Sequence, residues 1–203
     1  MKLHEAATTP NCRRVRIFLA EKGIEVPVVP VDVGKAENRQ DAFREKNPMG
    51  RVPVLELDDG TFIAESVAIC RYFEQLQPEP ALMGGGDAEK AARIEMWQRR
   101  MELEITVPIM QVFRNTHPYF ADRIQQYPDY GESQRSHATK RLAWLDRELA
   151  DREFVAGDEY SIADITAQIG IDFGRVTKFR VTEETPNLLR WHQAVSARPS
   201  AKA

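Results

Sequence analysis

The chain has 203 residues, of which 42% are hydrophobic and 29% charged, and its formal net charge is −3. This composition is typical of a globular protein with a real core. Acidic and basic residues are interspersed, which argues against a nucleic-acid partner or a membrane-binding face. Early charges and Pro10 interrupt any signal-peptide pattern, and no apolar run approaches the roughly 18 residues of a membrane span.

The number and spacing of the cysteines indicate the redox state of the compartment. The two cysteines, Cys12 and Cys70, form neither a CxxC motif nor a cluster with metal-ligand spacing. So few cysteines suit a reducing compartment, in which disulfides are not part of the scaffold. We therefore expect a cytoplasmic protein without a metal site.

The first part of the chain alternates strand and helix patterns. The expected elements are a strand at 2–6, a helix opened by the turn at 8–10 and ended by Gly23, a strand at 26–33, a short helix at 40–46, strands at 52–57 and 61–64, and a helix at 65–76. The turn Asp58-Asp59-Gly60 favours a hairpin between the last two strands. This β-α-β-α-β-β-α order predicts a short mixed sheet with helices on both faces.

The chain changes character at residues 77–86, where two prolines and three glycines favour a loop. We place a domain boundary there, with one domain at 1–78 and a second at 87–203. Strand patterns nearly vanish in the second domain. Its expected helices are a long one capped by Asp87 and carrying Ile94, Trp97, Met101 and Ile105, another at 133–149, one opened by a capping box at Ser161 to Asp164, and a last one at 186–197.

Three local motifs then stand in order along the chain. Residues 47–55 resemble the "NPxGxVPxL" segment of cytosolic glutathione transferases, 63–69 resemble their "IxES.AI" segment, and 154–164 resemble a "fvaGd.fSiAD" segment of their second domain. The resemblance covers essentially the whole chain. It implies an α/β thioredoxin-like N-terminal domain followed by an all-α helical-bundle C-terminal domain, with glutathione as co-substrate and no resident cofactor.

The resemblance implies a clamp for the glutathione peptide. Pro53 would follow a cis bond, and the backbone of Val52 would pair with the cysteinyl unit as a strand does. Glu65 and Ser66 would begin a helix whose N–H groups attract the γ-glutamyl carboxylate. The plainer alternatives are a trans proline on an edge strand and an ordinary pair of N-cap residues.

The glycine end of glutathione carries a carboxylate, which a guanidinium suits. Arg51 and Arg39 match positions that hold this end in the family, whereas Asn38 replaces the basic residue common there. The alternative for both arginines is solvated surface charge.

Transferase chemistry needs a thiolate, and a free thiol titrates near about 8.5. Thr9 occupies the position of the serine or cysteine that activates the thiol in some classes, and the side-chain amide of Asn11 offers a second donor. The alternative is that one of the two caps the following helix. His117 lies near the end of the first long helix of the second domain, a region that faces the thiol site in the family, and could polarise a water; otherwise it is a helix-end histidine favoured by the dipole.

The cysteines and tryptophans carry weaker expectations. Cys12 at a helix N-terminus could have a lowered pKa and a redox role, or it could be packing. Cys70 is expected in the core. The tryptophans on helical apolar faces are likewise expected in the core.

The function expected from the resemblance is conjugation of glutathione to a small hydrophobic electrophile, by a two-fold homodimer with neither nucleic acid nor membrane as partner. One alternative is a glutathione-dependent disulfide reductase or peroxidase. The other is a non-catalytic interaction module. The electrophile cannot be identified from the sequence, because its pocket is shaped by side chains around residues 111–120.

Overall fold

The computed structural model describes residues 1–203, which divide into two compact units, residues 1–85 with 202–203 and residues 86–201. The change of unit falls at the end of the stretch rich in proline and glycine. The domain limits expected from the sequence, 1–78 and 87–203, stay a prediction. None of the helices combines the length and the apolar character that crossing a membrane requires.

The first unit has a thioredoxin-like order of elements, as the sequence predicted. Along the chain these are β1 (Lys2–Glu5), α1 (Pro10–Lys22), β2 (Val28–Pro30), η1 (Glu37–Arg39), α2 (Asp41–Arg44), β3 (Val54–Glu56), β4 (Phe62–Ala64) and α3 (Ser66–Leu76). The strands form one mixed sheet in the order β2-β1-β3-β4. β1 is parallel to β2 and antiparallel to β3, and β3 is antiparallel to β4.

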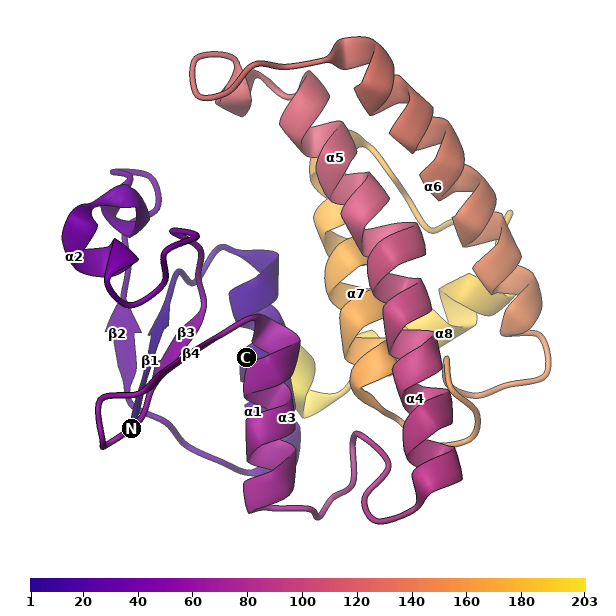
Figure 1. Ribbon diagram of the computed structural model, residues 1–203. Coiled ribbons are helices and arrows are strands. Elements are labelled where there is room, and N and C mark those ends of the chain that lie inside the picture. The colour runs from indigo at the N-terminus through magenta and orange to yellow at the C-terminus, as the bar shows by residue number, and fades with distance from the viewer. The chain divides into compact units, whose positions relative to one another are not determined.

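Helices cover both faces of this sheet, as Figure 1 shows for α2 on one side and for α1 and α3 on the other. Under α2, Phe43 packs in a small cluster with Val31 and Val54. On the opposite face α1 and α3 contact each other. The predicted layering is therefore confirmed.

Two details of the first unit differ from the expectation. The strand expected at 26–33 is paired only over Val28–Pro30, and Pro27 and Pro30 have no N–H to give to a ladder. The short helix expected at 40–46 is a single turn at Asp41–Arg44, preceded by the unpredicted turn η1.

The second unit is all helical (Figure 1). Its elements are α4 (Ala88–Arg100), η2 (Met101–Thr106), α5 (Val107–Thr116), η3 (Pro118–Phe120), α6 (Pro128–Glu148), α7 (Ile162–Gly174), η4 (Arg175–Thr177), α8 (Pro186–Ser196) and η5 (Pro199–Lys202). Helix α7 is the most buried of them, and the capping box expected at its start is present, with Ser161 accepting from a backbone N–H and Asp164 reaching back.

Two helices of the second unit differ in detail from the expected ones. The long helix that begins after Asp87 contains a π-helical stretch, η2, before it continues as α5. Helix α6 begins at Pro128, five residues before the expected start at 133. Its first turn presses against the end of α5, since a side chain at Gly131 would collide with Thr116 and Asn115. That long-range contact, which the local pattern does not contain, holds the extra turn.

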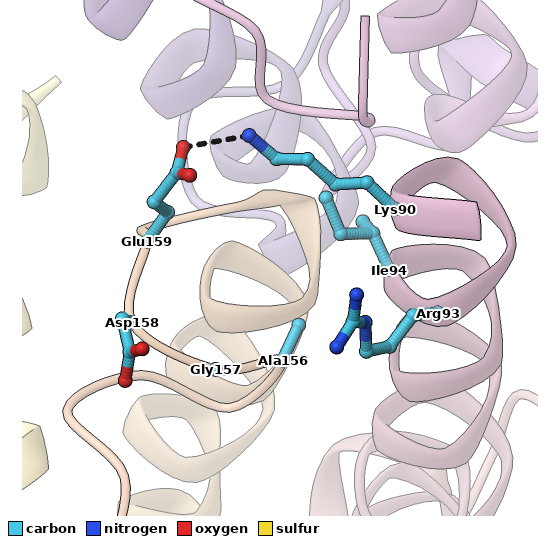
Figure 2. A pocket seen from close by; sticks show the side chains of 7 residues that line it. All are labelled: Lys90, Arg93, Ile94, Ala156, Gly157, Asp158 and Glu159. Atoms are coloured by element: carbon cyan, nitrogen blue, oxygen red, sulfur yellow. Dashed lines mark hydrogen bonds and ion pairs between the residues drawn. The ribbon is translucent and has the colours of Figure 1, made fainter. Parts of the chain in front are cut away.

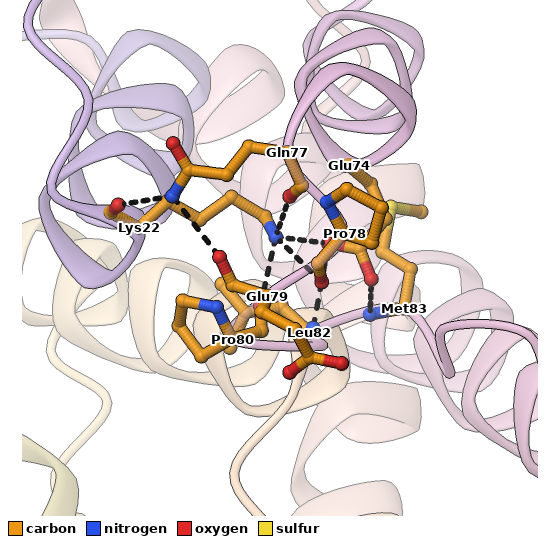
Figure 3. A network of polar contacts seen from close by, with 8 residues as sticks. All are labelled: Lys22, Glu74, Gln77, Pro78, Glu79, Pro80, Leu82 and Met83. Atoms are coloured by element: carbon orange, nitrogen blue, oxygen red, sulfur yellow. Dashed lines mark hydrogen bonds and ion pairs between the residues drawn. The ribbon is translucent and has the colours of Figure 1, made fainter.

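A buried polar network fixes the segment that ends the first unit (Figure 3). The ammonium of Lys22 is fully buried and lies 2.7 Å from the carboxylate of Glu74. It also donates to the carbonyls of Gln77, Pro78 and Pro80. Glu74 in turn accepts the backbone N–H of Met83 at 2.8 Å and that of Leu82 at 3.4 Å. One ion pair between α1 and α3 therefore anchors the whole loop that follows α3.

Candidate glutathione site

The sheet register brings three loops to one edge of the first unit. His4 of β1 pairs with Val54 of β3, and Val54 pairs with Ala64 of β4. Because β1 is antiparallel to β3 and β3 to β4, the end of β1, the start of β3 and the end of β4 meet at the same edge. The loop that leads into α1, the turn at Val52 and the start of α3 therefore lie together.

Val52 and Pro53 stand where the ladder of β3 begins. The Val52–Pro53 peptide bond is cis, as predicted. The paired residues of β3 start only at Val54, and Val52 makes no hydrogen bond to the rest of the backbone. Its N–H and C=O are therefore available to a short extended peptide, which would pair with them as a strand does.

Two asparagines hold the loop before Val52. Asn47 donates to the carbonyl of Arg51 at 2.8 Å, and Asn38 donates to the carbonyl of Gly50 at 2.6 Å. Asn38, which stands where the family commonly has a basic residue, thus positions the loop from η1. Gly50 has a φ of 59°, and a side chain there would lie 2.8 Å from the carbonyl oxygen of Asn38.

We expect Gly50→Ala to lower the free energy of unfolding and to weaken glutathione binding, because the new methyl group displaces Arg51 and Val52. Gly23→Ala is the matched control, since Gly23 has a φ of 64° but nothing within 4 Å of an added side chain. Both changes carry the left-handed strain of about 1–2 kcal/mol. Gly50→Ala should cost about 1–3 kcal/mol more in chemical denaturation, from overpacking. Equal losses of unfolding free energy in the two variants would show that the backbone of Asn38 moves away from the added methyl group without an energetic cost.

Arg39 and Arg51 are both exposed. The bond between Asn38 and Gly50 brings their two loops together, so both arginines belong to the same end of the edge. Neither guanidinium is engaged in an ion pair within the protein, which leaves each free to take a carboxylate.

Glu65 and Ser66 form the start of α3. Glu65 is exposed and has a φ of 67°, in the left-handed region, and no side chain caps the helix. Ser66 is buried, and its hydroxyl oxygen accepts a hydrogen bond from Arg14 at 2.6 Å. The pair therefore does not act as an ordinary N-cap, and the first N–H groups of α3 remain open to an anion.

Thr9 and Asn11 lie at the start of α1. The hydroxyl of Thr9 donates its proton to the carbonyl of Ala6 at 2.9 Å, and Thr9 makes no side-chain cap although it is the N-cap residue. Asn11 accepts from Arg14 at 3.0 Å through its amide oxygen, and its amide nitrogen donates to no group of the protein. Of the two donors expected for the thiol, Asn11 is the one whose proton is uncommitted.

Arg14 contacts two of the candidate site residues and is not indicated by the motifs. Its side chain is 2% exposed, and it bridges Asn11 and Ser66, which are 55 residues apart in the chain (66 − 11). The signal was present in the helical spacing, since Arg14 stands four residues before Phe18 on the same helical face. A charged residue on a buried face needs partners, and that requirement points to a polar site nearby.

The two cysteines are both free thiols in the core. Burial raises the pKa of the Cys12 thiol, and burial raises that of Cys70 to about 12. The lowered pKa considered for Cys12 at its helix N-terminus is therefore wrong, because desolvation outweighs its hydrogen bonds. The packing interpretation is the one the structure supports for both.

His117 belongs to the second unit and ends α5. Its Nδ1 accepts the N–H of Tyr119 at 3.1 Å, so the neutral ring carries its proton on Nε2. The ring lies 4.7 Å from that of Phe113, which also contacts Phe120 and Phe173. His117 thus combines the expected helix-end position with a place in an aromatic cluster. Of the tryptophans expected in the core, Trp97 and Trp191 are buried and Trp144 is half-buried.

Two surface hollows are lined by none of the candidate glutathione-site residues. One, of about 200 Å³, lies between the start of α4 and the loop before α7, and Figure 2 shows Lys90 paired with Glu159 across it. The other, of about 590 Å³, lies beside α1 and β2 and is lined by Leu19, Ile24 and Val28 among others. The candidate site is defined by backbone groups and side-chain donors of the first unit.

A thioredoxin-like unit with an open sheet edge, followed by an all-helical unit, is the architecture of the glutathione transferases. Residues 3–81 match the family described as "Glutathione S-transferase, N-terminal domain", and residues 106–199 match "Glutathione S-transferase, C-terminal domain". The chain belongs to the glutathione S-transferase family.

Relatives that match over nearly the full length agree with this assignment. The chain is 38% identical to Glutathione S-transferase 2 of Saccharomyces cerevisiae, over 100% of this chain and 88% of that protein. A crystal structure of a glutathione S-transferase class Gtt2 of Vibrio parahaemolyticus matches with a TM-score of 0.88 and 40% identity, over 100% and 96% of the two chains. A glutathione S-transferase domain-containing protein of Marinobacter aquaeolei matches with a TM-score of 0.94 and 40% identity, over 98% and 99%.

Proposed function

We propose that this protein conjugates the thiolate of glutathione to small hydrophobic electrophiles. The observation that carries the proposal is the sheet edge, where the unpaired backbone of Val52 and the uncapped start of α3 meet. Val52 pairs with the cysteinyl unit, and Ser66 with the N–H groups of α3 takes the γ-glutamyl carboxylate. Glu65 takes the ammonium group, and Arg51 with Arg39 takes the glycine carboxylate.

The thiol is activated by donors near the start of α1. Asn11 gives its free amide N–H to the sulfur, and such a donor stabilises the thiolate over the thiol. Thr9 would have to release the Ala6 carbonyl before it could donate, so it is the weaker candidate of the two. In an alternative arrangement, His117 activates the thiol by polarising a water. The proton on its Nε2 would serve for this, since Nδ1 is occupied by the Tyr119 amide. The protein then supplies binding, orientation and electrostatic stabilisation.

The proposal is tested by calorimetry with glutathione and by kinetics with an aryl halide such as chlorodinitrobenzene. Micromolar to millimolar binding with turnover above the uncatalysed rate is expected. Good binding with no turnover across a broad panel of electrophiles would exclude conjugation. Preferred turnover of glutathione mixed disulfides or hydroperoxides would favour the reductase or peroxidase, and no binding of glutathione would favour the interaction module.

We expect Ser66→Ala to weaken glutathione binding by about ten- to a hundredfold, because a hydrogen bond to a charged group contributes about 1.5–3 kcal/mol. Ser133→Ala, at an exposed serine of α6, is the matched control and should leave the affinity unchanged. Calorimetry gives the affinities, and thermal unfolding checks that both variants are folded. An unchanged affinity in folded Ser66→Ala would contradict a γ-glutamyl contact at this position.

We also propose that the active form is a two-fold homodimer in the cytoplasm, as expected from family membership. Sedimentation at micromolar concentration should give about twice the chain mass of 23.2 kDa. A single species at the monomer mass would contradict the assembly while leaving the proposed chemistry open to its own tests.

A further inference from the structure

The buried guanidinium of Arg14 touches both anion-binding ends of the site. It leaves α1 in the first helical turns, and its Nη1 lies 2.6 Å from the Ser66 hydroxyl oxygen and 3.0 Å from the Asn11 amide oxygen. Ser66 belongs to the γ-glutamyl end of the proposed site and Asn11 to the sulfur end. A single side chain, 2% exposed, therefore joins two functions that are distant in sequence.

Arg14 also dictates the direction of these hydrogen bonds. A guanidinium carries only donors, whereas a hydroxyl and a side-chain amide can each donate or accept. Facing Arg14, the Ser66 oxygen must accept, so its own proton is directed to another group. For the same reason Asn11 must present its oxygen to Arg14, which turns its NH₂ group away. Both groups thereby become donors toward whatever lies at the edge.

We propose that Arg14 is a positioning residue that fixes Ser66 and Asn11 as hydrogen-bond donors toward the two anionic groups of glutathione, the γ-glutamyl carboxylate and the thiolate. The inference rests on the proposed function and adds to it the device that orients two donors at once. The charge of Arg14 favours anions at both places. A lysine would keep the charge, but its rotating ammonium on a flexible stem lacks the rigid guanidinium plane that fixes the direction of the two N–H bonds of Nη1.

Arg14→Lys is the direct test. We expect glutathione to bind about tenfold or more weakly. We also expect the thiol pKa of bound glutathione, followed by thiolate absorbance against pH, to rise toward the value of about 8.5 for a free thiol. Phe18→Leu is the control, since Phe18 is fully buried one turn further along α1 and carries no polar group that could orient either donor. It should lose stability while leaving the affinity and the thiol pKa as in the native protein.

Double variants separate positioning from a merely structural role. If Arg14 acts through Ser66, Arg14→Lys should change glutathione affinity little further in a Ser66→Ala background. If it acts through Asn11, it should change the thiol pKa little further in an Asn11→Ala background. Full additivity in both backgrounds overturns the proposal and leaves Arg14 as a brace between α1 and α3.

A second variant keeps the test decisive if Arg14→Lys does not fold. Asn11→Asp keeps an oxygen facing Arg14 and puts another where the NH₂ group was. It should raise the thiol pKa of bound glutathione more than Asn11→Ala does, because an acceptor replaces the donor at the sulfur. A smaller or equal rise overturns the orientation proposed for Asn11. If the native protein binds no glutathione, the proposed function itself is refuted. If the native protein binds glutathione and the variants show the same affinity and thiol pKa, only the role of Arg14 is refuted.

Discussion

Asp164→Ala is expected to lower the free energy of unfolding by at least about 4 kcal/mol. The carboxylate is fully buried and accepts a hydrogen bond from the N–H of Val155 at 2.8 Å. It accepts two more from Ser161, one from the backbone N–H at 3.0 Å and one from the side-chain hydroxyl at 3.1 Å. It also accepts from the indole of Trp191 at 2.8 Å. Removing it orphans four buried donors and the start of the most buried helix. Chemical denaturation followed by tryptophan fluorescence measures the loss.

Asp158→Ala is the control for this prediction. Asp158 lies in the same loop but is exposed, so its removal should change the stability by no more than about 0.5 kcal/mol. Comparable losses in Asp158→Ala and Asp164→Ala would show that the loop, and not the buried carboxylate, holds the start of α7.

The same residue predicts a pH dependence. Burial raises the pKa of Asp164 from its ordinary value of 3.8 to about 6, against the opposing pull of its hydrogen bonds. Between these values the native state keeps a proton that the unfolded chain releases, so this stabilisation is complete below about pH 4 and is lost as the pH rises through about 6. The stability difference between the native protein and Asp164→Ala should therefore shrink by about 2 kcal/mol from pH 4 to pH 7. A difference that grows with pH would contradict the raised pKa.

Lys22→Met and Glu74→Leu are each expected to cost about 3–5 kcal/mol, because each leaves a buried charge without its partner. The pair is almost without solvent contact, with side-chain exposures of 0% and 4%. The double variant Lys22→Met with Glu74→Leu should cost less than the sum of its two single changes, since no unpaired charge remains. Denaturation of all four proteins closes the cycle.

The exposed pair of Arg93 and Glu89 is the comparison for that cycle, with exposures of 53% and 86%. Breaking it should cost no more than about 0.5 kcal/mol. Additive losses at Lys22 and Glu74 would mean that their bonds to the loop carbonyls and amides in Figure 3, rather than the ion pair, hold the segment after α3.

Much of the fold follows from the sequence, because its signals are local. Gly23 ends α1 in a left-handed conformation, and Ser161 with Asp164 forms the box that opens α7. The predicted elements differ from the structure where contacts between residues distant in sequence determine the bounds of a helix. The first turn of α6 depends on the approach of Gly131 to Thr116, which no window of neighbouring residues contains.

The sequence predicted the backbone features of the candidate site but not the buried side chain that contacts its residues. The Val52–Pro53 motif correctly indicated a cis bond, and Glu65 with Ser66 stands at a helix start as expected. Motif spacing gives positions along the chain but not which side chains turn inward. The spacing does not reveal that the Arg14 side chain is buried, nor that Cys12 is buried at its helix terminus.

The burial of both thiols bears on how such a protein survives its own substrates. Compounds that alkylate glutathione also alkylate accessible cysteines, and the thiolate is the form that reacts. Cys12 and Cys70 are shielded from solvent and held protonated by their surroundings. A reactive compound that reaches this protein therefore meets no competing nucleophile of its class on the polypeptide, and the sulfur it finds is that of the bound tripeptide.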